Sequence, residues 1–138
     1  MNFRDFLKDN IIYLDGGLGT LLQSRGLKPG ELPERWSISH PEVLQDIHKA
    51  YFDAGSNVVC SNTFGANCLK FDKNELEQIV SAAINNVKIA RDKSSNTAPK
   101  FVALDLGPSG KLLKPLGDLD FEDAVSVFAE TVKLGAKY

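Results

Sequence analysis

The stretch from residue 11 to residue 19 constrains the fold of this chain more than any other. Residues 11–14 are Ile-Ile-Tyr-Leu, and Asp15, Gly16 and Gly17 follow them directly. A short apolar run bounded by turn residues is typical of a strand buried on both faces, as in a parallel sheet. Glycines let the backbone turn sharply and approach a ligand closely. Since ligands bind at the carboxyl ends of parallel strands, we expect Asp15, Gly16 and Gly17 to lie at a binding site.

Two later segments repeat this order of strand, polar turn and helix. Residues 57–61 and 101–104 predict strands, and they lead into Asn62 and Thr63 and into Asp105. Because the carboxyl ends of parallel strands meet at one rim, these three polar residues would share that rim with Asp15. The alternative is that the asparagine and the aspartate only form turns, as these residue types often do.

Helices are predicted before, between and after these strands. Short helices are expected over residues 2–10 and 20–25, and the Pro- and Gly-containing segment 27–38 is expected to be a loop that Trp36 anchors. The longer helices are marked by a capping box at Ser39 and Glu42, by Asn74, and by a cap at Asp120, with Gly55 and Gly135 as stops. The core face of the last helix is expected to comprise Phe121, Ala124, Val125, Phe128 and Val132.

Repeated strand–loop–helix units predict an α/β chain, with the first three βα units of a (β/α)8 TIM barrel, incomplete as given. A complete barrel needs about 250 residues, whereas this sequence has 138 and stops where a fourth strand should begin. We therefore expect residues 1–138 to be the N-terminal part of a barrel domain, cut before the fourth strand. An unclosed barrel exposes sheet edges, and the chain could self-associate through them.

Composition excludes several classes of function. The formal net charge is −2, and lysines and arginines are scattered, so neither nucleic acid nor an anionic membrane is an expected partner. No apolar run approaches the roughly 20 residues that span a bilayer, and residues 1–10 do not resemble a signal peptide. Two cysteines do not form a disulfide framework, which favours a cytoplasmic location.

Two other kinds of site are disfavoured by spacing. The glycines after residue 14 invite comparison with a dinucleotide fingerprint, but Leu22 occupies the position of its third glycine, and Glu34 lies in a proline-rich loop. Cys60 and Cys68 match no common zinc spacing. We expect Cys60 to be a small buried hydrophobe and His48 to be an ordinary residue on a helix surface.

A series of short motifs in this order resembles the homocysteine S-methyltransferase family. The motifs are residues 14–20 (Leu-Asp-Gly-Gly-Leu-Gly-Thr), 33–34, 40–43 with 47–48, 54–59 and 62–67 (Asn-Thr-Phe-Gly-Ala-Asn). The third unit, at residues 105–110 and 115–117, is most similar to the version of this domain in cobalamin-dependent methionine synthases. The resemblance covers nearly the whole chain, although no single motif would carry it.

The resemblance implies a barrel that binds homocysteine and zinc at the carboxyl ends of its strands. In the family three cysteines hold the zinc, and none of the three lies in this chain, so Cys60 and Cys68 are not expected to be ligands. Zinc turns the homocysteine thiol into a thiolate nucleophile, and the implied methyl donor is methylcobalamin. Folate and cobalamin modules of the same polypeptide would be partners, together with the rest of the barrel.

The residues that match the family's amino-acid pocket are Asp15, Gly16 and Gly17, with Asn62, Thr63 and Asp105 as neighbours. The resemblance places no catalytic residue in these 138 residues, and we expect them to be inactive alone. Two alternatives stay open. One is a methyltransferase that uses betaine or S-methylmethionine, which the loop at 107–117 argues against. The other is a non-catalytic piece that self-associates.

Overall fold

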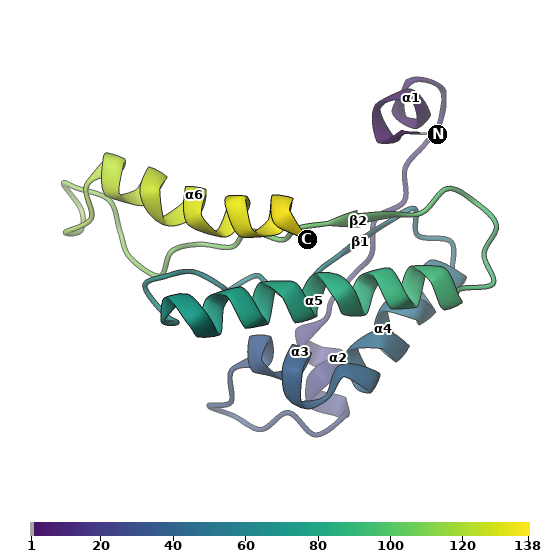
Figure 1. Ribbon diagram of the computed structural model, residues 1–138, viewed down its shortest axis with the longest axis horizontal. Coiled ribbons are helices and arrows are strands. Elements are labelled where there is room, and N and C mark those ends of the chain that lie inside the picture. Colours follow the sequence, from purple (N-terminus) through teal and green to yellow (C-terminus); the bar gives the residue numbers. More distant parts are fainter. Residues whose placement is uncertain (1) are drawn as a thin grey trace.

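The computed structural model describes residues 2–138, and a long helix runs through its centre. This helix is α5 (Lys73–Lys93). Figure 1 shows α6 (Phe121–Lys137) on one side of α5, and α2 (Gly19–Ser24), α3 (Trp36–Ser39) and α4 (Pro41–Asp53) on the other. Two short helical elements complete the set, α1 (Phe3–Asp9) and the 3-10 turn η1 (Pro33–Arg35). The chain is thus mixed α/β, with helices that cover a small sheet.

The sheet has two parallel strands, β1 (Val58–Cys60) and β2 (Phe101–Ala103), paired in the register Val58 to Phe101. Both were predicted from the sequence. Residues 11–14, the first of the three strands predicted from the sequence, do not form a strand. Leu14 makes only one parallel bridge to Val58. The prediction that this run is buried on both faces is wrong, since Ile11 is 76% exposed and Leu14 66%. A strand is buried only when neighbours cover it, and these side chains have no such cover among residues 2–138.

The helix starts differ from the predicted caps. His40, not Ser39, is the N-cap of α4, and no side chain caps that helix end. The capping-box prediction is therefore wrong: the Ser39 hydroxyl pairs with His40 Nδ1 at 2.8 Å instead. Helix α5 is capped by Asp72, whose carboxylate accepts from the two backbone N–H groups that follow Lys73. Gly55, at φ +109°, ends the α4 region as predicted, because a side chain rarely tolerates this conformation.

Helix α6 packs with a face that the sequence pattern predicted only in part, since Ala124 is the one predicted residue that is buried. Ala124, Val127 and Thr131 are buried, and the Thr131 hydroxyl donates to the carbonyl of Ala66 at 3.1 Å. Of the predicted face, Phe121 is 67% exposed, and Val125 and Val132 are also exposed. The helix continues through Gly135 to Lys137. Asp120 occupies the N-cap position, but its carboxylate pairs with Lys114 and not with a helix N–H.

The apolar core lies on both sides of α5. Trp36 is buried, as predicted, but it begins α3, a helix within a segment that was expected to be a loop. His48 is 1% exposed, so its prediction as a helix-surface residue is wrong. Helix α4 packs along α5, and His48 is one of the buried residues of α4. Among the described residues, no helix is both long and apolar enough to cross a membrane.

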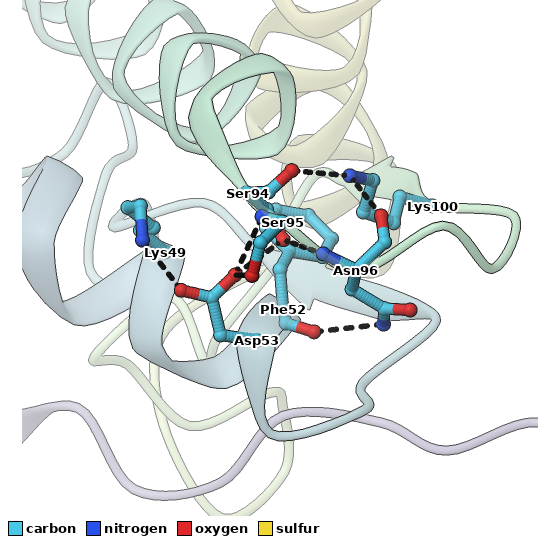
Figure 2. Close-up of polar contacts among 7 residues, drawn as sticks. All are labelled: Lys49, Phe52, Asp53, Ser94, Ser95, Asn96 and Lys100. Atoms are coloured by element: carbon cyan, nitrogen blue, oxygen red, sulfur yellow. Dashed lines mark hydrogen bonds and ion pairs between the residues drawn. The ribbon is translucent and has the colours of Figure 1, made fainter.

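A polar clasp joins the end of α4 to the linker that follows α5 (Figure 2). One carboxylate oxygen of Asp53 accepts from the Ser94 hydroxyl at 2.7 Å and from the Ser95 backbone N–H at 2.9 Å. The other accepts from Lys49. Since the linker leads into β2, this clasp helps to position the start of β2.

Candidate functional site

A cavity of about 340 Å³ opens where the two strands and the segment 11–14 end. Four of the six residues predicted from the sequence line it: Asp15, Gly16, Asn62 and Asp105. The structure thus brings together side chains from three separate turns, and a cavity of this size is typical of small-molecule sites. The wall also contains Leu18, Leu22, Pro33, Glu34, Cys60 and Phe64.

Asp15 is held by the backbone of β1. Its carboxylate oxygen Oδ2 accepts the N–H of Cys60 at 2.9 Å, and its own N–H donates to the carbonyl of Val58 at 3.0 Å. These bonds fix the carboxylate at the cavity. The glycine turn is supported from α4, where the Tyr51 hydroxyl donates to the carbonyl of Gly17 at 2.7 Å. Gly17 itself does not line the cavity.

Asn62 and Thr63 use their polar groups inside the protein. The Asn62 side-chain amide donates to the carbonyl of Pro33 at 2.7 Å and to the Ser37 hydroxyl at 3.1 Å. Thr63 is fully buried and outside the cavity wall, and its hydroxyl donates to the carbonyl of Asp105 at 2.8 Å. Both contacts tie neighbouring turns together, which stabilises the rim on which Asp105 lies.

The cavity is acidic. Asp15, Glu34 and Asp105 line it, and Lys70 pairs with Glu34 at 3.2 Å. Burial, with the nearby charge of Asp15 as a second cause, raises the pKa of Asp105 above its ordinary value. Such a site favours a cationic group, because a positive charge between Asp15 and Asp105 relieves their repulsion.

Sequence reasoning missed Glu34 and Phe64 as members of the site. Glu34 was considered in a dinucleotide pattern and, with Pro33, in a family motif, and Phe64 was considered only as part of a family motif. No local pattern in the sequence places Glu34 at the rim. Its contact with the turn at residues 62–67 depends on tertiary structure.

The described residues do not fit a zinc site. Residues 2–138 contain no group of three or more His, Cys, Asp or Glu side chains placed to hold a metal ion. Burial, together with the nearby charge of Asp15, raises the pKa of Cys60 to about 12. Without a metal, this thiol therefore stays protonated at neutral pH.

An acidic cavity at the ends of parallel strands, next to a glycine turn, is typical of a small-ligand site in an α/β protein. The sequence profile of the homocysteine S-methyltransferase family matches residues 12–137, and the chain belongs to that family. The resemblance inferred from the sequence is thereby confirmed.

Relatives and solved structures agree with this family. The chain is 30% identical over 119 residues to methionine synthase of Mycobacterium tuberculosis (strain ATCC 25618 / H37Rv), an alignment that covers 78% of this chain and 10% of that protein. Crystal structures of the homocysteine methyltransferase MmuM from Escherichia coli share the fold. The metallated form matches at a TM-score of 0.80 with 18% identity, over 97% of this chain and 53% of that one. The oxidized form matches at 0.81, over 52% of its chain. The chain therefore spans about half of the solved relatives and a tenth of the curated one.

Proposed function

We propose that this chain supplies the amino-acid-binding side of an enzyme that transfers a methyl group to the sulfur of homocysteine, giving methionine. The observation that carries the proposal is the acidic cavity in which Asp15 and Asp105 meet at the strand ends. An α-ammonium group is the cation that such a pair would take from an amino acid. Family membership supplies the substrate class.

The roles of the individual residues follow from their contacts. Asp15, held in place by the N–H of Cys60, accepts a hydrogen bond from the ammonium group. Asp105 adds the second negative charge. The turn at Gly16 and Gly17 provides backbone N–H groups that can donate hydrogen bonds to the amino acid's carboxylate. The Tyr51 hydroxyl holds this turn through its hydrogen bond to the Gly17 carbonyl. Asn62 and Thr63 act indirectly, because their side-chain hydrogen bonds stabilise the turns that form the rim of the cavity.

The reaction itself needs groups beyond the described cavity. A free thiol has a pKa near 8.5, so only a small fraction is a thiolate at neutral pH. In the family zinc supplies the thiolate. We propose that its ligands lie outside these 138 residues, because the cysteines present do not fit it. The similarity to a methionine synthase favours methylcobalamin as the donor. We further propose that residues 1–138 form the first units of the barrel and are inactive alone, as coverage of about half of MmuM suggests.

Self-association is a second candidate role for the isolated chain. Ile11, Tyr13 and Leu14 are exposed beside β1, and unpaired edges with apolar side chains promote pairing between chains. Sedimentation velocity at increasing concentration measures this directly. We expect dimers or larger species, and a monomer at all concentrations would contradict the proposal.

A titration with L-homocysteine, followed by NMR chemical shifts, tests the amino-acid site. Asp15→Asn keeps an oxygen that accepts from Cys60 but removes the charge. Since a charged hydrogen bond contributes about 1.5–3 kcal/mol, its Kd should rise roughly 10- to 100-fold. Asp46→Asn is the matched control, because Asp46 is an exposed aspartate on α4 away from the cavity. Equal affinities of the two variants would remove Asp15 from the site, and shifts that avoid residues 15–17 and 105 would refute the proposed site.

A further inference from the structure

Glu34 is a buried charge whose two carboxylate oxygens both have partners on the neighbouring turn. The side chain belongs to η1 and the residue is 4% exposed. Oε1 accepts the backbone N–H of Gly65 at 3.0 Å, and Oε2 accepts from Lys70 Nζ at 3.2 Å. Both contacts reach across the rim, from the segment before α3 to the turn after β1.

The contact with Gly65 is so close that a larger residue there would displace the Glu34 carboxylate. A Cβ built on Gly65 would lie 2.3 Å from Glu34 Oε1, well inside van der Waals distance. A second close approach lies on the other side of the turn, where the N–H of Gly107 donates to the carbonyl of Phe64 at 3.0 Å. A Cβ on Gly107 would lie 2.1 Å from that carbonyl oxygen. Residues 64 and 65 thus have a close neighbour on each side, the Glu34 carboxylate and the backbone of Gly107.

The contacts at Gly65 and Gly107 determine the position of Phe64. Its ring lines the cavity although the residue is largely exposed, so packing alone does not fix it. The backbone on either side of the ring is fixed by Glu34 and by Gly107. A rim turn without these two contacts would lose the wall that the ring provides.

We propose that Glu34 is a positioning residue that shapes the cavity through Gly65 and Phe64, and does not bind the amino acid itself. The inference rests on the proposed function for its ligand, homocysteine. Both oxygens of the Glu34 carboxylate already have partners, because one accepts from the Gly65 N–H and the other pairs with Lys70. The carboxylate is therefore not available to bind the ligand. The Phe64 ring then provides an apolar wall for the carbon chain and sulfur of the substrate, while Asp15 and Asp105 take the ammonium group.

Two variants of Glu34 separate positioning from direct binding. Glu34→Gln keeps an oxygen for the Gly65 N–H but removes the charge, whereas Glu34→Ala removes both. A positioning role predicts that Kd for L-homocysteine rises about fivefold or more for the alanine variant and less than about twofold for the glutamine variant. A direct ligand of the ammonium group would make both variants equally weak, and that result would overturn the proposal. Glu42→Ala, at an exposed glutamate of α4, is the matched control.

Hydrogen exchange in the ligand-free chain tests the same proposal without the substrate. The Gly65 amide should exchange at least about tenfold faster in Glu34→Ala than in the wild type, and Glu34→Gln and Glu42→Ala should leave it protected. Unchanged exchange at Gly65 in the alanine variant would overturn the proposal. If that variant does not fold, loss of Gly65 protection or weakened binding in Glu34→Gln would overturn it. Failure of the wild type to bind L-homocysteine would refute the proposed function, and the exchange data would still decide the role of Glu34.

Discussion

Replacement of His48 gives the sharpest test of the folded structure. Neither ring nitrogen of His48 has a hydrogen-bond partner among residues 2–138, and burial lowers its pKa to about 4. The unfolded chain protonates this histidine near pH 6.5. Between these values the unfolded state binds more protons, so the free energy of unfolding falls as the pH falls. From pH 7 to pH 5 the loss from this one group is about 2 kcal/mol.

Two substitutions divide this effect into its parts. His48→Leu fills nearly the same volume and removes the unpaired nitrogens, so the free energy of unfolding at pH 7 should rise by about 1–3 kcal/mol. His48→Gln keeps an unpaired polar group but does not titrate. Both variants should lose the pH dependence that His48 causes, and only the leucine variant should gain stability at pH 7.

Urea unfolding followed by circular dichroism, at pH 7 and at pH 5, measures both quantities. The comparison of each variant with the wild type cancels the carboxylates that titrate in every chain. A wild type that loses no more stability than His48→Leu on going to pH 5 would refute the reasoning. That result would mean that the imidazole is protonated, or hydrogen-bonded, in the folded chain.

The remaining predictions concern the clasp and two glycines. The hydrogen bond from Lys49 is the first cause that lowers the pKa of Asp53, so its charge stabilises the fold above its unfolded pKa, and this contribution is lost on acidification. Asp53→Asn should lower the urea midpoint at pH 7, and the gap to the wild type should narrow toward pH 2; a constant gap contradicts this. Gly107→Ala forces a Cβ against the carbonyl oxygen of Phe64 and should lower the free energy of unfolding by about 1–3 kcal/mol. Gly19→Ala adds a methyl group in open space at the start of α2 and should raise the free energy of unfolding by roughly 0.4–1 kcal/mol. Thermal unfolding measures both changes. Equal melting temperatures for the two alanine variants would contradict the close approach at Gly107.

Strand ends are readable from local pattern, and four of the residues predicted from them line one cavity. Asp15 and Asp105 follow apolar runs directly, Asn62 follows one after Ser61, and parallel strands bring such positions to one rim. Thr63 is the next residue after Asn62 in the same turn, yet its side chain is fully buried. Whether a strand-end side chain enters the cavity or the core depends on the turn that follows, which the alternation pattern does not encode.

Burial was the least predictable property. Helical periodicity identified α6, but the face that packs against its neighbours contains Thr131, and the more apolar positions Phe121 and Val125 stay exposed. His48 is likewise buried, although histidine is less often fully buried than apolar residues. Periodicity states which side chains share a face, whereas neighbouring elements decide which face is covered.

The sequence by itself determined the order of strands and helices, the glycine turn after Leu14 and the family to which the chain belongs, because these depend on local pattern and on motifs in sequence. Only the tertiary structure decided that Glu34 reaches Gly65 across the rim, and that burial, with Asp15 nearby, raises the pKa of Asp105. These are contacts between residues far apart in the chain. Their energies depend on distance and burial, which exist only once the chain has folded.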